Sequence, residues 1–304
     1  MDATTRRLLI GVQLCFGVFP ALGKIAMPAF TPKAVLVWRL LVGSAVLMTM
    51  AIWRHGRAAR PPAAELLRLF GLALLGVIVN QFLFLEGLSR TTSLNAGLLI
   101  TVIPIATTAI AVLLGRERAT SRRMAGIGLA VAGVASLFLL RLARRGDAGG
   151  STAVGDAFIV VNAISYSFYL VLAKGVLSRL PQLVVVAWLF VFGALVMPWI
   201  ALDVPWAPAA AHAPQWWALV GILLFPTLLA YLLNTIVLAR THASTTAAYV
   251  MLQPFVAMLL GLTLLHEELH WSELVTGAFV LAGLWLVSVQ APEPAERPAA
   301  QRPA

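Results

Sequence analysis

The sequence predicts an all-α membrane protein of ten transmembrane helices, arranged as two inverted five-helix repeats around a central cavity. Composition gives the membrane class: of 304 residues, 61% are hydrophobic and 11% are charged, whereas soluble domains average about 45–50% and about 25%. The mean hydropathy is +0.91. Apolar runs close to the roughly 20 residues that a spanning helix needs recur along the whole chain. An internal repeat, described below, gives the arrangement.

Charges, prolines and glycines divide the apolar runs into ten candidate spans. These spans are 8–29, 34–53, 66–88, 94–114, 124–142, 155–177, 181–201, 216–237, 244–265 and 272–290. The first run follows Arg6 and Arg7 and imitates a signal peptide, but we expect it to be retained because it has a counterpart in the second half. We predict a first repeat at 1–146, a Gly-rich linker at 147–154, a second repeat at 155–291 and a disordered cytoplasmic tail at 292–304.

Lys and Arg residues predict the orientation. With a cytoplasmic N-terminus, 15 of the 22 Lys and Arg residues fall in cytoplasmic segments and 5 in outer segments. Positive residues concentrate on the cytoplasmic side, so both termini are expected there, in the inner (plasma) membrane. Basic residues placed between apolar runs argue against nucleic acid as a partner. Lys24 and Arg39 lie within spans near their outer ends, where snorkelling to headgroups competes with substrate contact as an explanation.

The repeat appears when the chain is compared with itself at a shift of 150 residues. No gap is needed. The matched pairs include Lys24/Lys174, Val35/Val185, Trp38/Trp188, Gly43/Gly193, Gly71/Gly221, Arg90-Thr91/Arg240-Thr241, Pro104/Pro254, Glu117/Glu267 and Gly133/Gly283. Each repeat holds an odd number of helices, so the second enters the membrane from the opposite side. If the two halves exchange their conformations, the centre opens to one side of the membrane and then to the other. The repeat therefore predicts transport.

Residues 83–134 resemble the EamA-type module of the drug/metabolite transporter superfamily. The resemblance rests on Asn95-Ala96-Gly97, Pro104, Gly115, Glu117, Gly126 and Gly133. The second copy keeps Pro254 and Glu267 but has Leu265 in place of Gly115 and Thr276 in place of Gly126. The resemblance implies a secondary transporter, often an exporter of amino acids or other metabolites, with a cavity lined by helices 1, 3, 4, 6, 8 and 9. It implies no ATP hydrolysis, in keeping with the lack of a G-x-x-x-x-G-K-[ST] loop.

Polar and aromatic side chains inside the spans are the candidates for substrate binding, because polar groups in lipid are costly and turn toward protein or water. Helical spacing gathers them on shared helix faces. The candidates are Gln13, Phe16, Lys24, Asn80, Gln81, Asn162, Tyr166, Tyr169, Tyr231, Asn234, Tyr249 and Gln253. The alternative is hydrogen bonding between helices. The aromatic members favour an aromatic or amphipathic solute.

Two prolines and one carboxylate are candidates for roles in conformational change and proton coupling. Pro104 and Pro254 each remove a backbone hydrogen bond in mid-helix, which predicts either a conformational hinge or a static kink. Glu86 is a candidate for a coupling proton if burial raises its pKa. An ion pair with Arg90, four residues later, is the alternative role.

Two other functions compete with transport. The segment His266-Glu267-Glu268-Leu269-His270 matches the H-E-x-x-H zinc-protease motif, but it falls at a predicted turn and shows no third ligand. A non-transporting scaffold is the other alternative. The single cysteine, Cys15, excludes an internal disulfide or a cysteine-rich metal site. We therefore predict no enzyme, catalytic residue, metal or cofactor. The expected partners are the bilayer and a small molecule, and the chain is expected to be a monomer or a homodimer.

Overall fold

The computed structural model describes residues 3–116, 119–143, 152–238, 249–250 and 252–288, and within these ranges it is helical without strands. The first repeat contains α1 (Ala3–Gly17), α2 (Phe19–Ala26), α3 (Pro32–His55), α4 (Ala63–Ala73), the π-helical segment η2 (Leu74–Ile78), α5 (Val79–Ser89), α6 (Ser93–Ile100), α7 (Val102–Leu113) and α8 (Ser121–Ala143). The second contains α9 (Ala153–Leu177), α10 (Gln182–Ile200), α11 (Ala213–Ile222), the π-helical segment η4 (Leu223–Leu229), α12 (Ala230–Leu238), α14 (Leu252–Thr263) and α15 (Trp271–Ser288).

Seven of the described helical stretches are long and apolar enough to cross a membrane, and α14 and α15 contribute shorter apolar helices. Together with α8, these account for all ten predicted spans and confirm the fold class. The tail 292–304, most of the linker, Glu117, Arg240 and Thr241 lie outside the described residues.

The duplication is visible in where the helices begin. The starts of α3, α4 and α8 are Pro32, Ala63 and Ser121, and those of α10, α11 and α15 are Gln182, Ala213 and Trp271. Each start in the second set lies 150 residues after its counterpart in the first. The π-helical segments η2 and η4 also interrupt the same helix of each repeat. The sequence shift therefore corresponds to a structural repeat.

The packing of α3 against α10 shows that the repeats are inverted. A Cβ on Gly43 would lie 2.5 Å from the ring of Phe190, and a Cβ on Gly193 would lie 2.9 Å from Leu40. Residue numbers thus rise along one helix as they fall along the other, so these equivalent helices run antiparallel. Phe190, which faces Gly43, is the repeat counterpart of Leu40, which faces Gly193. A two-fold relation between the repeats requires this match.

Two tryptophans repeat this relation at opposite ends of the same pair. Trp38 Nε1 donates to the carbonyl of Trp206 at 2.8 Å, after the end of α10. Trp188 Nε1 donates to the carbonyl of Ala59 at 2.9 Å, after the end of α3. A residue and its repeat counterpart therefore lie at opposite ends of the bundle.

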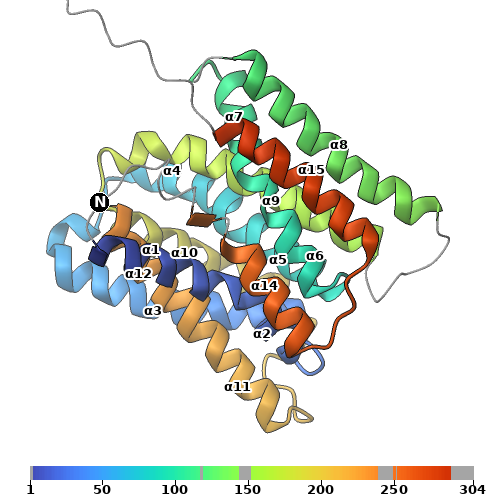
Figure 1. Cartoon of the computed structure of the whole chain (residues 1–304). Helices are drawn as coiled ribbons and strands as arrows, with labels where there is room; N and C mark the ends of the chain where they lie inside the picture. The colour runs from blue at the N-terminus through green and yellow to red at the C-terminus, as the bar shows by residue number, and fades with distance from the viewer. Residues whose placement is uncertain (1–2, 117–118, 144–151, 239–248, 251, 289–304) are drawn as a thin grey trace, which may run out of the picture.

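The fifth helix of each repeat packs on the other, and α8 and α15 lie side by side (Figure 1). A Cβ on Gly283 would lie 2.6 Å from the carbonyl oxygen of Gly126, and one on Gly133 would lie 2.6 Å from Phe279. Small residues allow this close approach of backbones. The small residues Gly126 and Ala130 of α8 therefore pack against α15 of the same chain.

Candidate functional site

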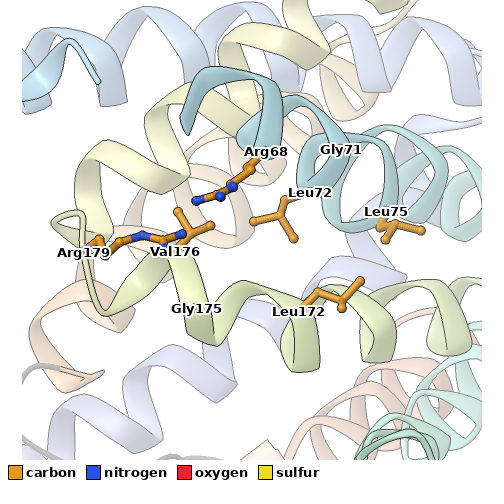
Figure 2. Close-up of a pocket in the computed structure, with 8 residues that line it drawn as sticks. All are labelled: Arg68, Gly71, Leu72, Leu75, Leu172, Gly175, Val176 and Arg179. Carbon is orange, nitrogen blue, oxygen red and sulfur yellow. The ribbon is translucent and has the colours of Figure 1, made fainter. Parts of the chain in front are cut away.

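A groove of about 420 Å³ lies between the third and sixth predicted helices (Figure 2). Its walls are one face of α4 and η2 and the C-terminal half of α9. The lining residues are Arg68, Gly71, Leu72, Leu75, Leu172, Gly175, Val176 and Arg179. Figure 2 shows the two arginines at one end and Leu75 and Leu172 at the other. The groove thus has a charged mouth and an apolar far end, where Leu172 is exposed.

Glu65 neutralises part of the charge at this mouth. Its Oε1 lies 2.9 Å from Arg68 Nη1 and 3.1 Å from Arg179 Nε. Farther in, the ring of Tyr169 packs on Gly76, where a Cβ would come within 2.5 Å of it. Because Gly76 directly follows Leu75, the inner end of the groove borders the tyrosines of α9.

The equivalent place in the second repeat is closed. Gly71 has no atom within 4 Å of an added Cβ, whereas its counterpart Gly221 would meet Leu22 at 3.1 Å. Gly221 lies on α11, which packs against α2. The two halves therefore share a sequence pattern and a fold but differ in packing at matching positions.

A cluster of aromatic and polar side chains occupies the interior beyond the groove. This central cluster consists of Phe16, Phe19, Arg39, Gln81, Tyr166, Tyr169, Phe190 and Tyr231. Tyr231 has edge contacts with Phe16 at 5.7 Å and Phe190 at 5.0 Å between ring centroids. Tyr166 and Tyr169 lie 5.4 Å apart by the same measure. Both lie within electrostatic reach of Tyr231, so α1, α9, α10 and α12 meet at this point.

Arg39 is the charged member of the central cluster. Its residue exposure is 3%, its Nε donates to Thr227 Oγ1 at 3.0 Å, and its guanidinium carbon lies 4.1 Å from the centroid of the Phe19 ring. Arg39 Nη1 has no hydrogen-bond partner among the described residues. The expectation that Arg39 snorkels to headgroups is therefore wrong, because the side chain turns inward across the bundle.

The π-helical segment η4 places the acceptor for Arg39. Pro226 has no N–H, so it cannot donate to the carbonyl of Ile222 four residues earlier. The hydroxyl of Thr227 donates to that carbonyl instead, at 2.8 Å. The same oxygen then accepts the hydrogen bond from Arg39 Nε. The proline defect thus orients a side-chain oxygen toward the centre.

Gln81 is the second member of the central cluster with unused hydrogen-bonding capacity. It is 4% exposed and lies beside the hydroxyl of Tyr231. Neither its side-chain nitrogen nor its side-chain oxygen has a partner by hydrogen-bond geometry within the described residues. Buried amides normally form hydrogen bonds. The side chains of Gln81 and Arg39 therefore bring to the central cluster buried polar atoms that lack hydrogen-bond partners among the described residues.

Four of the predicted substrate-binding residues pair with one another across helices. Gln253 Nε2 donates to Gln13 Oε1 at 2.6 Å. Asn80 Nδ2 donates to the Asn162 carbonyl at 3.3 Å, and Asn162 Nδ2 donates to the Asn80 carbonyl at 2.6 Å. These bonds match the alternative role of polar residues between helices.

The other predicted residues divide between the centre and the periphery. Tyr249 packs beside Leu9 and Val12, in the same apolar group as Phe16, and Asn234 is half-buried on α12. Lys24 is half-buried and lies within electrostatic reach of Glu267. Of the twelve predicted residues, Phe16, Gln81, Tyr166, Tyr169 and Tyr231 are the ones that meet in the central cluster.

The predicted hinge proline Pro104 does not lie in the middle of a helix. Pro104 is in the first turn of α7, and the preceding helix α6 ends at Ile100, so the chain breaks at Thr101. A proline is tolerated in a first turn because the N–H that it lacks is not needed there. The fourth helix is thus interrupted rather than kinked. Pro254 lies in α14, and residues 249 and 250 before it are also helical. A hinge role stays a prediction for both prolines.

The carboxylates considered for proton coupling and for metal catalysis both have other partners. Glu86 forms a short ion pair with Arg90. The H-E-x-x-H segment is not helical, and Glu267 accepts hydrogen bonds from Ser93 N at 2.8 Å and Leu94 N at 3.0 Å. No group of three potential metal ligands occurs among the residues that the structure describes. The structure therefore does not support the protease alternative.

Phe190 and Pro226 are not among the residues that the sequence predicts for the site, and for Arg39 the sequence leaves substrate contact and snorkelling as alternatives. A charged residue eight positions into the apolar helix α3 was the available signal for Arg39. Pro226 is visible within an apolar span, and it precedes the threonine that receives Arg39. Phe190 carries no sequence signal of its own, because its role depends on the crossing with Gly43.

Comparison with known proteins agrees with this architecture. The pattern described as the EamA-like transporter family matches residues 7–139 and again 153–289. An uncharacterized transporter of Archaeoglobus fulgidus is 27% identical, covering 95% of this chain and 99% of that protein. The uncharacterized transporter YyaM of Bacillus subtilis is 23% identical, covering 84% of each chain.

More distant similarities extend this set. A WAT1-related protein of Arabidopsis thaliana is 25% identical, covering 72% of this chain and 66% of that protein. One solved crystal structure superposes with a TM-score of 0.65 at 19% identity, covering 94% of this chain and 98% of that chain. At this identity the structural likeness shows the fold alone.

Proposed function

The chain belongs to the EamA-like transporter family, and from this premise we propose that it is a secondary active transporter that exports a small metabolite across the inner membrane. An amino acid, in particular an aromatic one, or a related amphipathic compound is the proposed substrate. The central cluster supports this choice, because it combines six aromatic rings with two polar side chains, Arg39 and Gln81. Binding sites for such molecules are mainly apolar, with a small number of polar groups that fix orientation.

The difference between Gly71 and Gly221 carries the proposal of alternating access. These counterparts occupy matching positions in the two repeats, yet one borders an open groove and the other is packed against Leu22. Inverted repeats that exchange their conformations produce such a difference in each end state, open on one side and closed on the other. A static scaffold has no need for the asymmetry.

The charge distribution supports a groove that faces the cytoplasm. Arg68 and Arg179 stand at its mouth, and both belong to the segments that the excess of Lys and Arg assigns to the cytoplasmic side. An exporter loads its substrate from that side. The structure then corresponds to the loading state, with the tyrosines of α9 separating the groove from the outer half.

The proposed energy source is an ion gradient, with a proton as the coupling ion. Proton uptake by Glu86 would require its ion pair with Arg90 to open.

Transport by proteoliposomes tests the proposal. The purified full chain is reconstituted, and exchange of a broad panel of labelled metabolites is followed with and without a protonophore. We expect exchange of at least one amphipathic metabolite, and its loss in Gly71→Trp, which fills the groove. The matched control is Gly128→Trp, at another glycine with open space around it, on the exposed face of α8. Absence of exchange across the whole panel, with a related transporter active in the same vesicles, would refute transport.

A further inference from the structure

Arg39 is a buried cation without a carboxylate partner. Its polar and ring contacts are Thr227 Oγ1 and the face of Phe19, and the nearby ionisable group is Tyr231. No acidic side chain lies within ion-pair distance of it among the residues that the structure describes. The other buried members of the central cluster are neutral, so the positive charge is not balanced from within.

An unbalanced guanidinium at this depth is costly. Charged groups inside a membrane protein are rare, pair with one another or line a substrate pathway. The Phe19 ring offsets part of the lost hydration through a cation–π contact, and Thr227 satisfies one N–H. Arg39 Nη1 remains unsatisfied. Replacement by a neutral residue would relieve this cost, so its presence calls for a ligand.

We propose that Arg39 binds the carboxylate of the transported substrate, and that the substrate is therefore an organic anion with an aromatic or other apolar body. The inference rests on the proposed function and narrows its substrate class. A carboxylate matches the planar donor array of arginine. The rings of Phe19 and Tyr231 border the guanidinium and receive the apolar body.

The same surroundings discriminate against a second charge on the substrate. The α-ammonium of an amino acid would need an acceptor, and Gln81 offers one neutral amide oxygen. Repulsion from Arg39 and the lack of a neighbouring carboxylate both disfavour a cation there. A carboxylate without an amino group is thus the preferred form.

Thermal stabilisation of the purified full-length protein tests the anchor. The probes share one ring and differ in charge: 3-phenylpropanoate, its neutral amide, phenylalanine and phenethylamine. We expect 3-phenylpropanoate to stabilise most, phenylalanine less, and the amide and the amine not at all. Stabilisation by the amine or the amide equal to that by the carboxylate overturns the proposal.

Two variants separate a ligand anchor from a structural arginine. Arg39→Gln should weaken 3-phenylpropanoate binding at least about 30-fold, which corresponds to about 2 kcal/mol, while the unliganded protein melts at the same or a higher temperature. Arg54→Gln, at the exposed end of the same helix, should bind normally. A lower melting temperature for unliganded Arg39→Gln, with carboxylate binding retained, means that Arg39 is structural and overturns the proposal.

Exchange in proteoliposomes distinguishes this inference from the proposed function. The panel contains carboxylates, neutral compounds and amines of similar size. Exchange of carboxylates that is lost in Arg39→Gln supports both proposals. Exchange restricted to neutral compounds or amines, or unaffected by Arg39→Gln, overturns the anion inference and leaves transport intact. Failure of every class to exchange refutes transport itself and the inference with it.

Discussion

Glu267 connects the two repeats through a single carboxylate. It lies in the connection before α15 and accepts hydrogen bonds at the start of α6, from the backbone of Ser93 and Leu94 and from the Ser93 hydroxyl at 2.8 Å. The first N–H groups of a helix have no partner within the helix, and a negative charge there is favourable. The residue that sequence reasoning weighed as a catalytic base is therefore a helix cap.

Glu267→Ala should destabilise the protein by about 1–2 kcal/mol, the usual cost of losing a side-chain cap. The physical reason is that two partly buried backbone donors are left without an acceptor. Thermal unfolding in detergent measures the change. Glu268→Ala is the matched control, because Glu268 is the exposed neighbour, and it should unfold like the wild type. Equal stability of the two variants would contradict the capping role.

The ion pair between Lys33 and Asp203 predicts a dependence on pH outside the membrane. Lys33 Nζ lies 2.7 Å from Asp203 Oδ2, and this hydrogen bond lowers the pKa of Asp203 from its ordinary value of 3.8. A lowered folded-state pKa contributes stability that is present above the ordinary value and is lost as pH falls through the folded one.

Asp203→Asn should therefore melt at a slightly lower temperature than the wild type near pH 7, and the difference should shrink as the pH falls below 3.8 and vanish once Asp203 is protonated in the folded protein. Added salt should shrink it, because the pair is exposed. Lys33→Gln should show the same loss, and the double variant no more. A difference that persists in acid would assign the effect to something other than the ion pair.

At the residue scale, the sequence indicates which polar side chains turn inward but not what they meet. Gln13, Gln81 and Asn162 are all buried, as expected of polar residues in apolar helices. Gln13 and Asn162 form hydrogen bonds with other helices, whereas Gln81 lies beside the Tyr231 hydroxyl without a hydrogen bond of normal geometry to any described residue. This distinction depends on contacts between segments far apart in the chain, and helical spacing alone contains no information on it.

At the scale of the helices, the apolar runs and the 150-residue shift were sufficient to predict the order of the helices and most of their ends. Interruptions inside the helices were not predictable in the same way. The break at Thr101 and the segments η2 and η4 leave the apolar pattern unchanged. Both π-helical segments hold a hydrogen bond to another helix: Thr227 accepts from Arg39 in η4, and the Leu75 carbonyl accepts from Ser165 in η2.

Gly43→Ala should destabilise the crossing of α3 and α10 by about 1–3 kcal/mol, the usual cost of overpacking. The added methyl would lie 2.5 Å from the ring of Phe190 and 3.2 Å from Thr227, so the ring must move. Thermal unfolding checks this. Gly128→Ala, with open space around it, should be neutral or gain up to about 1 kcal/mol from helix propensity. The same outcome for both variants would mean that the crossing is looser than the structure indicates.

At the scale of the whole molecule, duplication and inversion follow from the sequence, while the conformation does not. Two repeats with one pattern predict two arrangements related by exchange of their roles. Which arrangement is occupied depends on a small free-energy difference between two packings of the same residues. The open position at Gly71 and the closed one at Gly221 are therefore findings of the structure alone.

Cysteine labelling at these two positions tests inversion and conformation together. In a Cys15→Ala background, Gly71→Cys and Gly221→Cys are exposed to a membrane-impermeant maleimide from each side of sealed vesicles. We expect Gly71→Cys to react rapidly from the cytoplasmic side, since its surroundings are open. Gly221→Cys should react slowly, and only from the outer side, because Leu22 covers it until the closed side opens. A transported substrate should change the two rates in opposite directions, since opening one side closes the other. Fast reaction of both variants from one side would place counterparts on the same face of the membrane, which an inverted pair of five-helix repeats does not permit.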